Sequence, residues 1–192
     1  MSSADPITEF LNAVERAQAH QIDTSPVALA TTDADGRPSV RIVLLRATDH
    51  RGFVFHTNYE CRKGRELDAT RHAALCCYWT TLDEQIRVEG DVERLSADES
   101  DEYFNARPRG SQLGAWASNQ SAVLASRETL EEAYREVERR FDGKPVPRPP
   151  FWGGYRLVPT RIEFWYGRPD RLHDRVLYTR QRDGWHIERL YP

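Results

Sequence analysis

Residues 27–57 read VALATTDADGRPSVRIVLLRATDHRGFVFHT. Three apolar, β-branched runs, at residues 27–32, 40–46 and 53–57, are separated by Asp33-Ala34-Asp35-Gly36 and by Asp49-His50-Arg51-Gly52. Aspartate and glycine between alternating apolar runs are typical of tight hairpin turns. Two hairpins in series predict a meander, and therefore an antiparallel sheet.

The rest of the chain continues this pattern. Further strands are expected at residues 73–79, 85–95, 155–158, 161–166, 175–179 and 185–190. Helices are expected from Pro6 to about His20, at residues 63–71, from a capping box at Ser96 to about Ala106, and from Ser126 to Phe141. So many short strands predict one mainly β domain, residues 1–192, folded as a closed or nearly closed barrel. Residues 1–22 are expected to form an N-terminal helical segment.

Composition limits the class of protein. Hydrophobic residues make up 39% of the chain, charged residues make up 30%, and the net charge is −3. This acidic balance disfavours a nucleic-acid-binding module. Neither a membrane span nor a secretory signal is visible, so a cytoplasmic protein is expected. Cys61, Cys76 and Cys77 lack the spacing of metal ligands, so we expect thiols and no metal site.

Two clusters of cations lie near the first strands. Arg41 and Arg46 end an apolar strand on opposite faces, and both could simply emerge into solvent. Arg62 and Lys63 begin an expected helix, where the helix dipole disfavours cations. A bound phosphate would explain that placement, although a solvated surface pair is the usual alternative.

Two more clusters lie further along the chain. Tyr103 and Arg107 are four residues apart at a helix end, and Ser111 follows after a turn, so the three could converge on one phosphate. Arginines that stabilise a helix C-terminus are the ordinary alternative. Arg171, His173 and Arg175 alternate onto one side of an expected strand and would repel each other unless an anion lies among them.

In this order the motifs resemble the pyridoxine (pyridoxamine) 5′-phosphate oxidase family. The resemblance covers nearly the whole chain from Val27 onward. Its motifs are Arg41-Ile-Val-Leu-Leu-Arg46, Thr57-Asn58, Arg62-Lys63-Gly64, Tyr103-Phe-x-x-Arg107-Pro-Arg109-x-Ser111-Gln112, Gln120-Ser121, Phe151-Trp152-Gly153-Gly154, Glu163-Phe164-Trp165 and Arg171-Leu172-His173-Asp174-Arg175.

The resemblance implies an FMN-binding split β-barrel that works as a homodimer, with FMN at the subunit interface. Residues 153–192 would supply dimerisation and substrate-binding strands. The implied FMN contacts are Arg41, Ile42, Val43, Leu44, His56, Thr57, Arg62, Lys63, Gln85, Gln120, Ser121, Trp165 and Arg175. Arg46, Tyr103, Arg107 and Ser111 would bind the substrate phosphate, and Arg171 and His173 would be the catalytic residues against the pyridine ring.

The implied reaction is oxidation of pyridoxine 5′-phosphate and pyridoxamine 5′-phosphate to pyridoxal 5′-phosphate. A hydride passes to FMN, and O₂ is then reduced to H₂O₂. Two alternatives stay open: a related phenazine-pathway flavin oxidase, and a non-catalytic carrier of FMN or pyridoxal phosphate. Arg46, His56, Glu84 and Tyr166 depart from the family's usual lysine, tyrosine, arginine and glutamine, which leaves the preference between the two substrates open.

Overall fold

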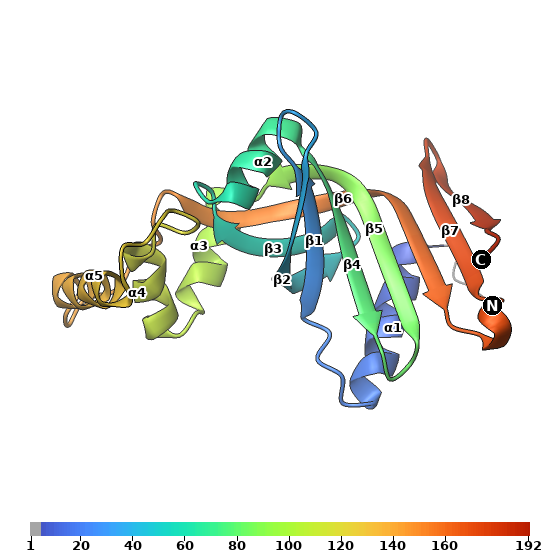
Figure 1. The fold of residues 1–192 in the computed structure, drawn as a ribbon, viewed down its shortest axis with the longest axis horizontal. Coiled ribbons are helices and arrows are strands. Elements are labelled where there is room, and N and C mark those ends of the chain that lie inside the picture. Colours follow the sequence, from blue (N-terminus) through green and yellow to red (C-terminus); the bar gives the residue numbers. More distant parts are fainter. Residues whose placement is uncertain (1–4) are drawn as a thin grey trace.

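Eight strands form one antiparallel sheet in the computed structural model, which describes residues 5–192. Their order is β3-β2-β1-β4-β5-β6-β7-β8, and β3 also pairs with β6, so the first six strands close into a barrel (Figure 1). β7 and β8 extend the sheet beyond the barrel at one end of the molecule. The expected mainly β fold with a closed barrel is confirmed.

The strands are close to their expected places. Their bounds are β1 (Pro26–Thr32), β2 (Pro38–Asp49), β3 (Gly52–Asn58), β4 (His72–Trp79), β5 (Glu84–Arg94), β6 (Trp152–Tyr166), β7 (Asp174–Gln181) and β8 (Gly184–Arg189). Both predicted hairpins are present, with β1 antiparallel to β2 and β2 antiparallel to β3. The hairpin turns could be read locally because their residues set the turn geometry.

β6 is one long strand, and the prediction of two separate strands at residues 155–158 and 161–166 was wrong. Its register against β5 shifts between Glu89 and Gly90, which leaves Thr160 as an extra residue. A bulge of this kind accommodates Pro159, which has no N–H to donate, without ending the strand. Before the bulge β6 pairs with β3 and closes the barrel, and after it β6 pairs with β7.

One helix closes the barrel core. α1 (Pro6–Ala19) begins at Asp5, whose carboxylate accepts hydrogen bonds from the backbone N–H groups of Ile7 and Thr8. Its buried face joins the barrel core, where the rings of Phe10 and Phe53 meet edge to face. Residues 1–4 of the expected N-terminal segment lie outside the described residues. Within residues 5–192 no helix has the length and apolarity to cross a bilayer.

Three of the other helices frame the site described below: α2 (Arg62–Thr70), α3 (Ala97–Asn105) and α4 (Arg109–Ala117). They are followed by α5 (Arg127–Arg140) and, after β6, by a short 3-10 helix η1 (Pro169–Arg171). The capping box at Ser96 and Glu99 is present as predicted. α4 was not expected, because Pro108 and Gly110 suggested a turn. Leu113 of α4 is buried in a second apolar core with Phe104 and Trp152, and this packing favours the helix.

Candidate functional site

A cavity of about 530 Å³ lies where β2, β3, α2, α3 and α4 meet. Many residues expected from the sequence line it. They are Ile42, Val43, Leu44, His56, Thr57, Lys63 and Gln120 from the expected cofactor set, and Arg46, Tyr103, Arg107 and Ser111 from the expected substrate-phosphate set. Pro108 and Trp152 complete the lining.

Lys63 fixes one wall of this cavity. Its ammonium donates to the side-chain oxygen of Gln120 at 2.9 Å and to the hydroxyl of Thr57 at 3.1 Å. Lys63 lies in the first turn of α2, where buried Cys61 is the N-cap and accepts from the N–H of Gly64. Ser121, next to Gln120, has a left-handed backbone with φ of 72°. The end of β3, the start of α2 and the distant segment at Gln120 thus bring polar groups to one place.

Arg107 and His56 carry buried polar atoms that lack partners. Within residues 5–192, Nη1 of Arg107 and both ring nitrogens of His56 are shielded from solvent and make no hydrogen bond. The guanidinium of Arg107 lies 4.6 Å from the centre of the Trp152 ring. Leaving a charged donor unsatisfied is unfavourable, so an anion in the cavity would relieve the cost.

The electrostatic field of the cavity is positive. Burial, together with the charges of Arg107 and Arg46, lowers the pKa of His56 to about 4, so its ring is neutral at pH 7. Burial and the charge of Arg46 also lower the pKa of Arg107, which the phenol of Tyr103 partly opposes. Cations crowded together in this way favour a bound phosphate.

One expectation about this cluster was wrong. Tyr103 and Arg107 were expected on one face of a helix end, but α3 ends at Asn105 and Arg107 lies beyond it. Ser111, expected to follow a Pro/Gly turn, lies in the first turn of α4. The three side chains nevertheless line the same cavity.

A second group of expected residues lies across three neighbouring strands. Gln85 on β5 is paired with Trp165 on β6, and Trp165 is paired with Arg175 on β7. The guanidinium of Arg175 is held by buried Glu163, whose carboxylate accepts from its Nε at 2.7 Å and also pairs with Arg87. The three cofactor candidates therefore form one row on the sheet.

Arg171 and His173 lie beside this row, although not as expected. β7 begins only at Asp174, so the predicted alternation of Arg171, His173 and Arg175 along one strand was wrong. Pro169 begins η1, and Asp170 and Arg171 have left-handed φ angles of 58° and 61°. The ring of His173 lies 4.4 Å from that of Trp165, and its Nδ1 accepts from the backbone N–H of Arg168.

The two groups are separated within one chain. The cavity is beside α3 and α4, whereas η1 and β7 are at the opposite end of the molecule (Figure 1). One copy of the chain therefore does not bring Arg171 and His173 onto the residues expected to hold the substrate phosphate.

Two acidic residues that hold the expected arginines were given no role in the sequence analysis. Glu66 and Glu163 are 5% and 4% exposed, and each pairs with two arginines. Glu66 lies four residues after Arg62 on α2, a spacing that places both on one helix face and could have suggested the pair.

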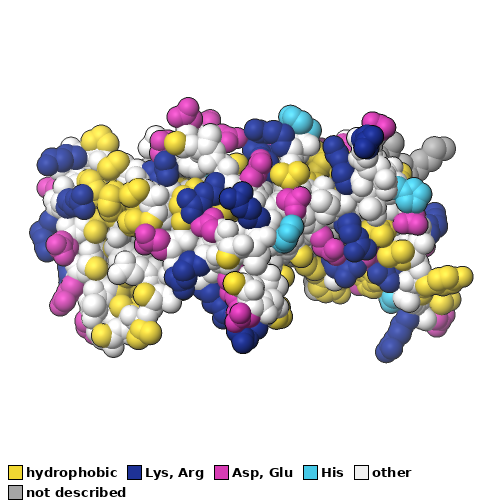
Figure 2. Space-filling model, turned by 90° about the horizontal axis from the view of Figure 1, so that it is seen from above, with side chains coloured by type: hydrophobic (Ala, Val, Ile, Leu, Met, Phe, Trp, Pro, Cys, Tyr) yellow, Lys and Arg dark blue, Asp and Glu magenta, His cyan; other side chains and the backbone are white. Residues whose placement is uncertain are grey.

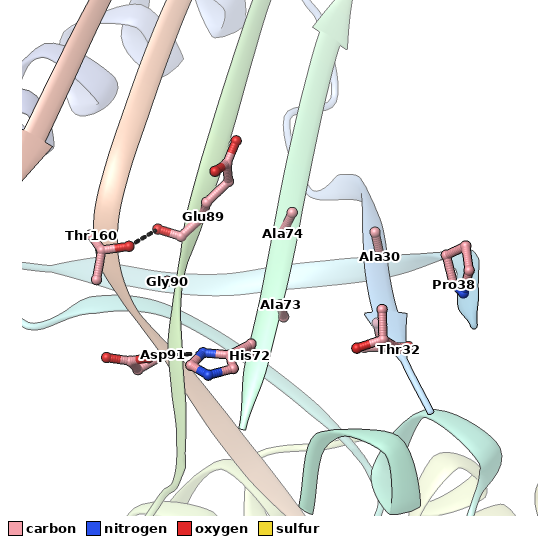
Figure 3. Close-up of a pocket in the computed structure, with 11 residues that line it drawn as sticks. Ala30, Thr32, Pro38, His72, Ala73, Ala74, Glu89, Gly90, Asp91 and Thr160 are labelled. Carbon is pink, nitrogen blue, oxygen red and sulfur yellow. Dashed lines mark hydrogen bonds and ion pairs between the residues drawn. The ribbon is translucent and has the colours of Figure 1, made fainter. Parts of the chain in front are cut away.

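A different hollow, of about 460 Å³, lies over β1, β4 and β5 (Figure 3). Small side chains such as Ala30, Ala73 and Ala74 dominate its lining, and none of the expected site residues contributes to it. Its exposed His72 and Asp91 bind each other at 2.9 Å. Within residues 5–192, no three His, Cys, Asp or Glu side chains gather as a metal site requires. The cavity beside Lys63 is the stronger candidate.

Family models match most of the chain. Residues 14–141 match the model described as pyridoxamine 5′-phosphate oxidase, and residues 152–192 match the pyridoxine 5′-phosphate oxidase C-terminal dimerisation region. A pyridoxine/pyridoxamine 5′-phosphate oxidase of Myxococcus xanthus (strain DK1622) is 55% identical over 100% of this chain and 94% of the relative. One from Rubrobacter xylanophilus is 57% identical over 98% and 87%.

Solved structures share the fold. PhzG from Burkholderia lata 383, in complex with tetrahydrophenazine-1-carboxylic acid, has a TM-score of 0.94 and 35% identity over 99% of this chain and 94% of that chain. A pyridoxamine 5′-phosphate oxidase-related, FMN-binding protein from Nostoc punctiforme has a TM-score of 0.77 at 20% identity, with both chains covered completely. At that identity the second likeness concerns the fold alone.

Proposed function

The chain belongs to the pyridoxamine 5′-phosphate oxidase family, and from this membership we propose that it oxidises pyridoxine 5′-phosphate and pyridoxamine 5′-phosphate to pyridoxal 5′-phosphate with FMN as cofactor. The observation that carries the proposal is the cationic cavity in which the buried Nη1 of Arg107 lacks a partner among the described residues. Tyr103 and Ser111 add hydroxyl groups to the same lining. A guanidinium fork with hydroxyls beside it suits a phosphate monoester.

The neighbouring wall suits the cofactor. Lys63 places an ammonium in the cavity, and Arg62 precedes it at the start of α2, where backbone N–H groups also favour an anion. Thr57 and Gln120 supply hydrogen-bonding groups on the same wall. When bound, FMN would accept the hydride from C4′ of the substrate and deliver the electrons to O₂ as H₂O₂.

A homodimer would complete the site. A second copy of the chain is the natural source of the groups that one chain places far from the cavity (Figure 1). These groups are Arg171, His173 and the row of Gln85, Trp165 and Arg175. The outer face of β2 supports this arrangement, because Val40, Ile42 and Leu44 are 70%, 64% and 43% exposed, and the last two line the cavity. Apolar side chains exposed in a row are typical of an interface.

In that dimer the protein's part is binding and orientation. Arg46, Tyr103, Arg107 and Ser111 hold the phosphate end of the substrate, while Arg171 and His173 of the second copy face the pyridine ring. When both the phosphate and the ring of the substrate are fixed, C4′ is held in a reactive orientation toward the flavin. The reaction then does not depend on a random encounter between the two. A guanidinium near the C4′ substituent would also stabilise negative charge that develops there.

An anaerobic titration tests the proposal. The flavin-loaded protein is mixed with pyridoxine 5′-phosphate without oxygen and then exposed to air. We expect the visible absorbance of the oxidised flavin to bleach on mixing and to return with oxygen as pyridoxal 5′-phosphate forms. Unphosphorylated pyridoxine is the control and should bleach the flavin far more slowly, because it lacks the group that Arg107 binds.

The likeness to PhzG favours a second candidate, a flavin oxidase that acts on a reduced phenazine precursor. Identities of 55% and 57% to oxidases named for the pyridoxine substrates support the first candidate over the 35% to PhzG. A reduced tricyclic carboxylic acid in the same anaerobic titration separates them. Bleaching by that compound and not by pyridoxine 5′-phosphate would assign the chain to the second reaction.

The surface charges and the state of the cysteines bear on the remaining expectations. Basic and acidic side chains are interspersed on the face shown in Figure 2, which supports a small-molecule substrate over a nucleic acid. Cys61, Cys76 and Cys77 are all free thiols, as suits a reducing compartment, so the cytoplasm is the proposed location.

A further inference from the structure

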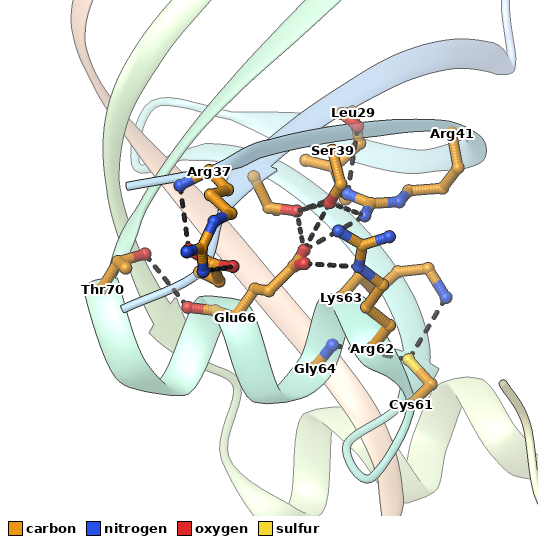
Figure 4. A network of polar contacts seen from close by, with 12 residues as sticks. Leu29, Arg37, Ser39, Arg41, Cys61, Arg62, Lys63, Gly64, Glu66 and Thr70 are labelled. Carbon is orange, nitrogen blue, oxygen red and sulfur yellow. Dashed lines mark hydrogen bonds and ion pairs between the residues drawn. The ribbon is translucent and has the colours of Figure 1, made fainter. Parts of the chain in front are cut away.

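Glu66 is a buried carboxylate at the centre of a network of donors (Figure 4). The side chain is 5% exposed, and it lies on the face of α2 that packs toward β1 and β2. Its Oε2 accepts from the hydroxyls of Thr31 and Ser39 at 2.5 and 2.6 Å. A buried charge is tolerated only when it is paired and hydrogen-bonded, and Glu66 meets both conditions.

Arg62 is one of its two cationic partners. Nε of Arg62 donates to Oε1 of Glu66 at 2.8 Å, and this is the one polar contact of the Arg62 side chain within residues 5–192. The side chain is otherwise 59% exposed. Both terminal nitrogens of the Arg62 guanidinium therefore remain open to a ligand, while the contact of its Nε with Glu66 fixes the orientation of the group.

Arg41 is the other partner, and it is more fully engaged. Its Nη2 donates to Glu66 at 3.1 Å and to Ser39, and its Nη1 donates to the hydroxyl of Thr31 and to the backbone oxygen of Leu29. The side chain is 20% exposed. Because both terminal nitrogens of Arg41 already donate hydrogen bonds within the protein, a bound anion would interact mainly with the positive charge of Arg41 and with its Nε.

We propose that Glu66 is a positioning residue for the phosphate end of the cofactor, because it fixes the guanidinium groups of Arg41 and Arg62 before the phosphate arrives. This inference rests on the proposed function, and it assigns a role to a residue that would not itself touch the anion. Lys63, next to Arg62, contributes a third cation that Glu66 does not contact.

Charge and orientation make opposite predictions here. As an isolated charge, Glu66 opposes the binding of a phosphate, so its neutralisation should strengthen binding. As an anchor, it holds two long side chains in one geometry and removes the entropy that they would lose on binding. Hydrogen bonds from Ser39, Thr31, Arg62 and Arg41 overcome burial and lower the pKa of Glu66 to about 2, so the anchor is charged throughout the physiological range.

Glu66→Gln separates the two effects, because it keeps the shape and removes the charge. The apoprotein is titrated with FMN and with riboflavin, which carries the same ring system without the phosphate. We expect the dissociation constant for FMN to rise about 10- to 100-fold and that for riboflavin to change less than about 2-fold. Glu163→Gln is the matched control, because Glu163 is also buried between two arginines but lies near the C-terminal strands. It should change the two affinities by the same factor.

Three results would overturn the inference: an unchanged FMN affinity, a tighter one, or an equal loss for FMN and riboflavin. If Glu66→Gln fails to fold, Ser39→Ala provides the test, since it removes one donor to Glu66 and one acceptor for Arg41. It should weaken FMN about 2- to 5-fold and leave riboflavin unchanged, and no loss for FMN would again refute the role. Failure of the wild-type apoprotein to bind FMN would instead reject the proposed function.

Discussion

The imidazole of His56 stacks on the phenol ring of Tyr103, with ring centroids 3.9 Å apart and the planes at 15°. The Trp152 ring lies parallel on the same stack, 5.4 Å from His56. The stack buries His56 beside two cations, Arg107 and Arg46, and that position makes its protonation unfavourable.

This stack predicts a dependence of stability on pH. The pKa of His56 is lowered from 6.5 to about 4, so between these values the unfolded chain binds a proton that the folded chain does not. The free energy of unfolding contributed by His56 therefore falls as the pH drops from 6.5 to 4. His56→Phe keeps the stack and should remove about 2 kcal/mol of this loss, after allowance for partial exposure of the ring. Urea unfolding at pH 7 and at pH 5 measures this difference in unfolding free energy, with exposed His50→Gln as the control. If His56→Phe and the wild type lose the same unfolding free energy between the two pH values, the assignment is contradicted.

Arg107 predicts a trade between stability and binding. Its buried Nη1 lacks a partner within the described chain, so Arg107→Met should raise the melting temperature of the substrate-free protein. The same change should raise KM for pyridoxine 5′-phosphate about 10- to 100-fold, because a charge-assisted contact to phosphate is lost. Steady-state kinetics and a thermal melt in phosphate-free buffer test both parts. An unaltered KM would place the substrate phosphate elsewhere.

Arg171 predicts a loss of turnover with the flavin retained. Arg171 has a left-handed backbone and lies beside the row of Gln85, Trp165 and Arg175. Both features suit a side chain that contacts the pyridine ring of the substrate. Arg171→Leu should lower kcat about 100-fold, as removal of a charge-stabilising donor does, and should leave FMN bound. The flavin absorbance of the purified variant and its rate of peroxide release are the measurements. Wild-type turnover would rule out the proposed contact with the pyridine ring.

Gly64 predicts a link between packing and cofactor binding. A Cβ at Gly64 would lie 2.1 Å from the backbone oxygen of Tyr59, so the start of α2 would have to shift. Gly64→Ala should cost about 1–3 kcal/mol of unfolding free energy and should release FMN, because Arg62 and Lys63 move with the helix. Gly114→Ala, in open space on α4, is the matched control and should stabilise the protein by up to about 1 kcal/mol. Full FMN occupancy in Gly64→Ala would contradict the link.

Local chemistry explains which parts of the fold could be predicted. The two hairpins and the capping box at Ser96 depend on residues within a few positions of each other. α4 could not be predicted in this way, since its helix depends on the burial of Leu113 against Phe104. The bulge at Thr160 also escaped prediction, because it is defined by the register of another strand.

The same distinction applies to the site. Its residue types could be read from the motifs, but the contact between Lys63 and Gln120 joins positions 57 residues apart and depends on how the chain folds back. Glu66 resembles an ordinary surface acid of a helix until Arg41 is brought against it from β2. Charged residues buried by a distant strand leave little trace in their own neighbourhood.

Closure of the barrel has a consequence for how the chain is made. β3 joins β6 through pairs such as Phe53 and Leu157, about a hundred residues apart, with four α-helices between the two strands. β1 to β5 precede β6 in the chain, so a sheet formed from these five strands during synthesis would have two unpaired edges, β3 and β5, and both pair with β6 in the folded protein. Such edges recruit other chains, so the nascent protein is most prone to aggregate in the interval before β6 leaves the ribosome. A contact this distant is also slow to form, and it should set the pace of folding.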